Sequence, residues 1–153
     1  MRYRGKALIV DDDPICLVVA RERLEAMGFA VIVREQGLGT AGTIRVERPD
    51  LLLVDVGLPD LTGDALAKLV ADAPSTRGLP IVLFSARETG ELAKLVRASG
   101  ALGAISKNAN ERQFISELET LLEGTLLART IGPGRLAGLG APAGGQRASL
   151  RRG

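Results

Sequence analysis

Four short apolar runs of this chain each end on a carboxylate, a hydroxyl or an ammonium group. The runs and the residues that close them are 8–10 with Asp11 and Asp12, 51–54 with Asp55, 81–84 with Ser85, and 104–106 with Lys107. Short apolar runs between amphipathic helices are typical of buried parallel strands. Ligands of such sheets bind beyond the carboxyl ends of the strands, so we expect these groups to converge on one edge. Three crowded carboxylates repel one another; the lysine supplies one positive charge, and a divalent metal ion would supply the rest.

The sequence between these runs predicts a strand followed by a helix five times over. The expected strands are 6–10, 29–33, 51–54, 79–84 and 102–105. The expected helices are 14–27, 38–47, 64–71, 88–98 and a last helix that starts after Asn110. Right-handed crossovers then give an α/β fold, a doubly wound five-stranded parallel sheet with helices on both faces.

Two helix starts carry capping signals. Asp13 precedes Pro14, which is the order expected for an N-cap residue and proline in the first helical position. Asn110 is followed three residues later by Gln113, as in a capping box. Because capping accounts for Asp13, Asp11 and Asp12 remain at the end of the first strand, where an acidic pair serves either a site or the turn that follows the strand.

Composition excludes several classes of function. The chain has no histidine, which removes histidine-based nucleophilic triads and histidine zinc sites. Aromatic residues make up only 3% of the chain, too few for a platform on which single-stranded nucleic acid stacks. No apolar run approaches the length that spans a membrane. We therefore expect a cytoplasmic protein with no membrane partner.

The last part of the chain differs in composition from the rest. Residues 1–123 are expected to form the domain, and residues 124–153, rich in Gly, Ala, Pro and Arg, a disordered tail. Since the whole chain has a net charge of +2 and the five arginines of the tail contribute +5, residues 1–123 carry −3. The tail could touch nucleic acid or anionic lipid, but a solvated tail is the simpler reading, and no nucleic-acid partner is expected.

The motifs at the strand ends resemble those of the receiver domain of bacterial two-component response regulators. The resemblance covers residues 5–123, and its carriers are segments 8–14 (LIVDDDP), 53–63 (LVDVGLPDLTG), 84–86 (FSA) and 106–107 (SK). It implies a flavodoxin-like fold of the stand-alone, chemotaxis-regulator type. It also implies a phosphoprotein of phosphorelay signal transduction that is not an enzyme beyond self-catalysed phosphorylation and dephosphorylation.

The resemblance also implies a role for each residue of the site. Asp55 would accept the phosphoryl group, Ser85 would hydrogen-bond it, and Lys107 would pair with it. The implied Mg²⁺ ligands are Asp11, Asp12, Asp55 and the backbone carbonyl of Gly57. The implied partners are a sensor histidine kinase or histidine phosphotransfer protein, and an output protein that binds the face made by 88–98, 102–105 and the last helix.

The chain departs from the family pattern at four positions. Asn108 follows the lysine where a proline is common, and Ala104 stands where the family usually has a switch tyrosine or phenylalanine. Gly57 and Arg87 occupy two positions that influence phosphoryl lifetime in the family. Without the aromatic at 104, the usual relay of phosphorylation to the output face is absent, unless Phe84 takes over part of its role.

Two other functions compete with this interpretation. An aspartyl-phosphate phosphatase of the haloacid dehalogenase type needs a second aspartate two residues after the first, where this chain has Gly57. A pseudo-receiver that binds partners without phosphorylation stays open because of Ala104, although the intact site residues argue against it.

Overall fold

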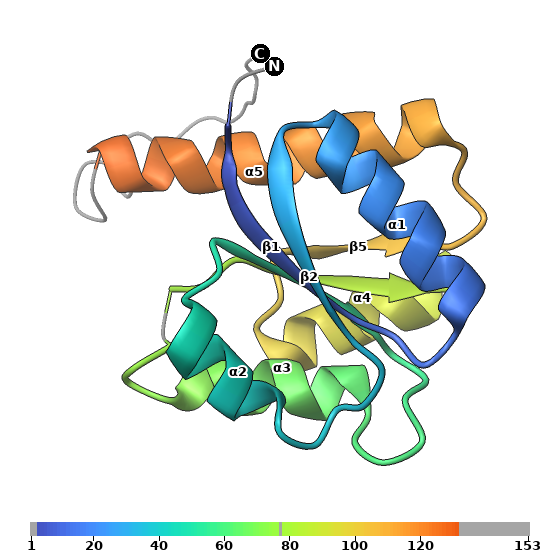
Figure 1. Ribbon diagram of the computed structural model, residues 1–153, viewed down its shortest axis with the longest axis vertical. Helices are drawn as coiled ribbons and strands as arrows, with labels where there is room; N and C mark the ends of the chain where they lie inside the picture. Colours follow the sequence, from blue (N-terminus) through green and yellow to red (C-terminus); the bar gives the residue numbers. More distant parts are fainter. Residues whose placement is uncertain (1–2, 77, 132–153) are drawn as a thin grey trace. The chain divides into compact units, whose positions relative to one another are not determined.

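Five parallel strands form one sheet in the order β2-β1-β3-β4-β5 (Figure 1). The computed structural model describes residues 3–76 and 78–131. The strands are β1 (Gly5–Val10), β2 (Phe29–Arg34), β3 (Leu51–Asp55), β4 (Ile81–Ser85) and β5 (Gly103–Ser106). The helices are α1 (Pro14–Ala26), α2 (Thr40–Glu47), α3 (Gly63–Asp72), α4 (Thr89–Ser99) and α5 (Glu111–Ile131).

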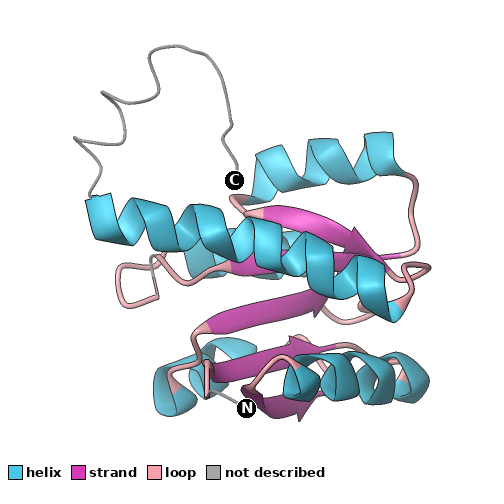
Figure 2. Ribbon diagram, turned by 90° about the horizontal axis from the view of Figure 1, so that it is seen from above, coloured by secondary structure: helices cyan, strands magenta, loops and turns pink. Residues whose placement is uncertain are grey.

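The strand order makes this a doubly wound sheet, as predicted. Helix α1 and the first turns of α5 cover one face, and α2, α3 and α4 cover the other (Figure 2). The chain reverses its winding direction between β1 and β3. Ligands of doubly wound sheets bind beyond the carboxyl ends of such a pair of strands. Asp11 and Asp55 stand at these two strand ends.

Alternate residues of the strands fill two cores. Leu52, Val54 and Leu83 belong to the core under α2, α3 and α4. Phe84 faces the other way and meets the fully buried Phe114 of α5 edge to face, with ring centroids 5.9 Å apart. Burial of each large aliphatic or aromatic side chain contributes about 1.5–3 kcal/mol, so the central strands hold the site's edge of the sheet firmly in place.

Both predicted helix caps are confirmed. The Asp13 carboxylate accepts hydrogen bonds from the backbone N–H groups of Ile15 (2.9 Å) and Cys16 (3.5 Å). Asn110 and Gln113 form the reciprocal capping box, each side-chain oxygen accepting a bond of 2.9 Å from the other residue's backbone N–H.

Some element boundaries differ from those predicted. Strand β4 begins at Ile81 rather than 79, because the Leu79 N–H bonds back to Thr76 in a turn and Pro80 has no N–H to give. Helix α2 begins at Thr40 rather than 38, because Gly39 has the left-handed backbone of a turn (φ +88°).

The chain divides into two compact units, Met1–Leu118 and Glu119–Gly153. The candidate site lies in the first unit. In the second, the described part continues α5 to Ile131, beyond the boundary expected at 123, and the expected tail over 132–153 lies outside the described residues. No described helix is both long and apolar enough to cross a membrane.

Candidate functional site

Asp11 is the buried carboxylate of the site. It follows β1, and its own backbone N–H bonds to the Arg34 carbonyl at the end of β2 (3.0 Å). Oδ1 accepts a hydrogen bond from the Asp13 N–H (2.9 Å). Oδ2 is fully buried and lies 2.9 Å from Lys107 Nζ, an ion pair whose geometry falls outside that of a hydrogen bond. This buried oxygen has an ion pair with Lys107 but no hydrogen bond, so it can also serve as a ligand for a cation.

Lys107 joins the ends of β1 and β3. Its Nζ lies 3.1 Å from Oδ1 of Asp55 as well as 2.9 Å from Asp11. The Lys107 backbone N–H is held by the Ser85 carbonyl (2.8 Å), so the lysine is anchored directly after β5 beside β4. One ammonium therefore bridges the two strand-end carboxylates, as the strand topology predicts.

Asp12 completes an acidic cluster with Asp11 and Asp55. One carboxylate oxygen from each of the three lies within 4.8 Å of the others. Asp11 and Asp55 are buried, whereas Asp12 is exposed. Among the described residues Lys107 is the one cation paired with this cluster, so its three carboxylates keep two negative charges in excess. Hard oxygen ligands, surplus charge and an open side fit Mg²⁺, which retains several of its waters.

The pKa values reflect this crowding. Burial raises the pKa of Asp11, and the neighbouring Asp55 carboxylate adds to the rise, against the lowering effect of Lys107 and the Asp13 N–H. Burial disfavours the Lys107 ammonium, but its ion pairs with Asp11 and Asp55 outweigh that effect and raise its pKa. The lysine therefore stays positively charged. Its single charge does not balance the negative charge of the acidic cluster.

Ser85 lies at the same sheet edge but has a different partner. Its buried hydroxyl accepts a hydrogen bond from the Arg87 N–H (3.0 Å), two residues into the β4–α4 loop. The hydroxyl proton remains free to be donated elsewhere. The Arg87 side chain lies 3.5 Å from Glu91 on α4.

Two glycines shape the space around Asp55. A Cβ on Gly57 would lie 3.8 Å from Asp55 Oδ2, so no side chain stands over that carboxylate. Gly63 packs against the backbone behind it, where a Cβ would be 2.7 Å from the Asp55 carbonyl carbon. Pattern reasoning gave Gly63 no role, because only the fold brings residues 55 and 63 into contact.

Asp60 is a second residue whose role was missed. Its carboxylate accepts hydrogen bonds from the backbone N–H groups of Gly37 (3.1 Å) and Leu38 (2.9 Å). Those bonds lower the Asp60 pKa and tie the loop after Asp55 to the loop after β2. The sequence shows only that Asp60 is an aspartate in a loop. That does not predict a hydrogen bond to Leu38, 22 residues earlier in the chain.

Comparisons with known proteins show the family of this chain. Residues 7–119 match the model of the response regulator receiver domain. The polar-differentiation response regulator DivK of Brucella anthropi is 29% identical over 115 residues, covering 75% of this chain and 94% of DivK.

Solved structures share the fold. The chemotaxis response regulator CheY4 of Vibrio cholerae has a TM-score of 0.71 at 23% identity, covering 79% of this chain and 99% of CheY4. A CheY-like receiver domain protein of Methanospirillum hungatei has a TM-score of 0.70 at 24% identity, covering 82% and 97%.

Proposed function

Because the chain belongs to the response regulator receiver domain family, we propose that Asp55 accepts a phosphoryl group from a sensor histidine kinase or a histidine phosphotransfer protein. The phosphorylated chain then signals by contact with an output protein. The observation that carries this proposal is the position of Lys107 Nζ, 3.1 Å from Asp55 and 2.9 Å from Asp11. A cation held there is placed to stabilise charge that arrives on Asp55.

The transfer is a displacement at phosphorus. One oxygen of the Asp55 carboxylate attacks the phosphorus atom, and the new O–P bond forms as the P–N bond to the donor's histidine breaks. The bonding electron pair stays on the imidazole nitrogen. A carboxylate is a weak nucleophile, so the rate depends on positioning and on neutralising the phosphoryl oxygens.

The residues of the site divide these tasks. Lys107 pairs with a phosphoryl oxygen, and Ser85 donates its free hydroxyl proton to another. Gly57 leaves the approach to Asp55 open. Asp11, Asp12, Asp55 and the Gly57 carbonyl would hold Mg²⁺, which supplies positive charge that lets carboxylates tolerate an incoming phosphoryl group.

Incubation with acetyl phosphate and Mg²⁺ tests the proposal. Acetyl phosphate transfers its phosphoryl group by cleavage of its P–O bond, with acetate as the leaving group. Intact mass spectrometry should show the gain of a single phosphoryl group that depends on Mg²⁺. The Asp55→Asn variant should gain none.

Asp72→Asn is the matched control, because Asp72 is exposed on α3 and pairs with Lys68 one turn away. It should be labelled as well as the unchanged protein. Equal labelling of the Asp55→Asn variant would refute the assignment. A folded, Mg²⁺-binding protein that takes no label would favour the pseudo-receiver.

A further inference from the structure

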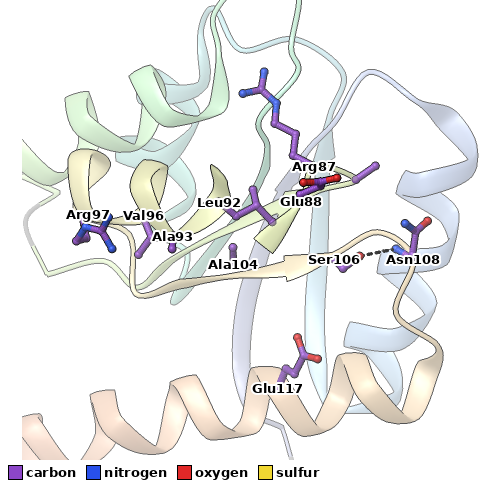
Figure 3. Close-up of a pocket in the computed structure, with 11 residues that line it drawn as sticks. Arg87, Glu88, Leu92, Ala93, Val96, Arg97, Ala104, Ser106, Asn108 and Glu117 are labelled. Atoms are coloured by element: carbon purple, nitrogen blue, oxygen red, sulfur yellow. Dashed lines mark hydrogen bonds between the residues drawn. The ribbon is translucent and has the colours of Figure 1, made fainter. Parts of the chain in front are cut away.

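Lys107 lies in a tight turn between β5 and α5. The Ser106 hydroxyl accepts a hydrogen bond from the Asn108 N–H (3.0 Å), which Figure 3 marks with a dashed line. The Ser106 carbonyl accepts another from the Ala109 N–H (3.1 Å). Asn108 does not fix its own backbone angle φ, as a proline would at this position. These bonds are local, so they do not tie the far side of the turn to the rest of the fold.

Arg23 of α1 ties the far side of the turn to another element. Its Nη1 donates a hydrogen bond to the Ala109 carbonyl (3.0 Å), although the two residues are 86 positions apart in the chain. The acceptor is the backbone oxygen two residues after Lys107. A hydrogen bond from a charged guanidinium is roughly twice as strong as one between neutral groups. Helix α1 therefore restrains the turn that carries the lysine.

The same guanidinium covers an aromatic pair that supports the Lys107 side chain. Arg23 Cζ lies 5.4 Å from the centre of the Phe114 ring. Phe114 meets Phe84 edge to face, and Lys107 Nζ lies 5.6 Å from the centre of the Phe84 ring. Both distances are within the range of a cation–π contact. A planar guanidinium can stack on a ring and donate hydrogen bonds from its edge at the same time.

The two rings connect Arg23 to Lys107 through the core. Phe84 and Phe114 are buried, with exposed fractions of 2% and 0%. Close-packed side chains transmit strain, because a displaced group has no empty space to enter. Arg23 thus contacts both supports of the lysine, one through the backbone of the turn and the other through the ring pair.

We infer that Arg23 is a positioning residue for Lys107 in phosphoryl transfer, a role that rests on the proposed function because Lys107 is taken to pair with the phosphoryl group. Arg23 holds the turn and the ring pair together, and this keeps Lys107 Nζ between Asp11 and Asp55. Group transfer depends on such placement, since a displacement of about 1 Å can slow a reaction by about a hundredfold.

Three variants of α1 test this role. Arg23→Met keeps an apolar stem over Phe114 but removes the guanidinium, so labelling by acetyl phosphate and Mg²⁺ should slow by about tenfold. Arg23→Lys keeps the charge without the planar face and should label at an intermediate rate. Arg21→Met is the matched control, because Arg21 is exposed on the same helix and pairs with Glu25 one turn away. It should label within about twofold of the unchanged protein.

A double-mutant cycle separates the positioning of Lys107 from a general effect on the fold. In the Lys107→Gln background, the further change Arg23→Met should alter the labelling rate by less than about twofold, because the group that Arg23 positions is gone. If Arg23 supported the fold alone, the same loss of rate would appear in both backgrounds. Urea denaturation checks that each variant is folded under the labelling conditions.

The ammonium signal of Lys107 provides a measurement that needs neither phosphorylation nor metal. In ¹H–¹⁵N spectra, an ammonium held by two carboxylates should exchange its protons with water more slowly than an exposed lysine does. Loss of the signal in Lys107→Gln identifies it. Arg23→Met should shift the signal and speed its exchange, whereas Arg21→Met should leave it unchanged.

An unchanged Lys107 signal in a folded Arg23→Met protein, or an equal loss of rate in both backgrounds of the cycle, would overturn the inference. If even the unchanged protein takes no label, the proposed function fails, and the Lys107 signal still decides whether Arg23 positions the lysine. If labelling of Asp55 proceeds and the signal does not respond to Arg23→Met, the positioning role fails and the phosphoacceptor assignment stands.

Discussion

The backbone of Gly63 packs against the peptide group of Asp55, and a methyl group on residue 63 would overlap the Asp55 carbonyl oxygen. The Gly63 N–H also bonds to the Val56 carbonyl (3.3 Å). The first residue of α3 thereby supports the strand end that presents the candidate phosphoacceptor. The contact leaves no room for a side chain, and it is made by rigid backbone on both sides.

We predict that Gly63→Ala destabilises the protein and impairs labelling of Asp55. Relief of the overlap must shift β3 or α3, and overpacking of this kind costs about 1–3 kcal/mol. Urea denaturation and acetyl phosphate labelling measure the two effects. Gly90→Ala on α4 is the control, since its Cβ would meet nothing within 4 Å; it should be neutral or slightly stabilising.

Replacement of Lys107 should affect metal binding and labelling in opposite directions. Lys107→Gln removes the ammonium that pairs with Asp11 and Asp55, so the acidic cluster becomes more negative. Mg²⁺ affinity should rise by about tenfold at low salt, and phosphoryl transfer should slow. Calorimetric Mg²⁺ titration and the rate of mass gain test this. Lys94→Gln on the exposed surface of α4 should change neither, and a weaker Mg²⁺ affinity in Lys107→Gln would contradict the prediction.

Substitutions should show that the consecutive residues Asp12 and Asp13 have different functions. Asp12→Asn removes a carboxylate of the acidic cluster and should weaken Mg²⁺ binding strongly with little loss of stability. Asp13→Ala removes the cap of α1 and should lower the urea midpoint while Mg²⁺ binding remains. If a folded Asp13→Ala protein lost Mg²⁺ binding while Asp12→Asn kept it, the roles assigned to Asp12 and Asp13 would be wrong.

Asp60 should stabilise the fold in a pH-dependent way. Hydrogen bonds from Leu38 and Gly37 lower its pKa below the ordinary value of 3.8, so its contribution is fully present above that value. The contribution is lost as pH falls through the lowered folded-state pKa. The free energy of unfolding of Asp60→Asn should therefore lie below that of the unchanged protein at pH 7, and the gap should close in acid. A gap for Asp60→Asn that widened in acid would disprove the role.

Phosphorylation should alter a confined part of the molecule. Without an aromatic at 104, the elements free to respond are Ser85, loop residues 86–88 and the first two residues of α4. Amide shifts in ¹⁵N spectra should concentrate there and at Asp55. Large shifts spread along α4 and the first turns of α5 would indicate a different switch.

Local sequence determined much of this protein. Apolar runs closed by Asp11, Asp55, Ser85 and Lys107 were enough to predict the parallel sheet, because strand period and crossover handedness leave few alternatives. The cap at Asp13 followed from the adjacent proline, since capping depends on neighbouring residues alone. The meeting of acidic and basic groups at one edge followed from strand direction.

Only the tertiary structure decided contacts between residues that no local pattern relates. It set the hydrogen bonds of Asp60 to residues 37 and 38, and it brought Gly63 against Asp55. It also turned Phe84 to the opposite face of the sheet from Ala104, where it packs on Phe114 and does not take the place of the missing aromatic. These outcomes depend on how loops fold over the sheet and on which face each side chain takes. Packing of the whole chain sets both, whereas strand direction and helix caps are set by residues close together in the sequence.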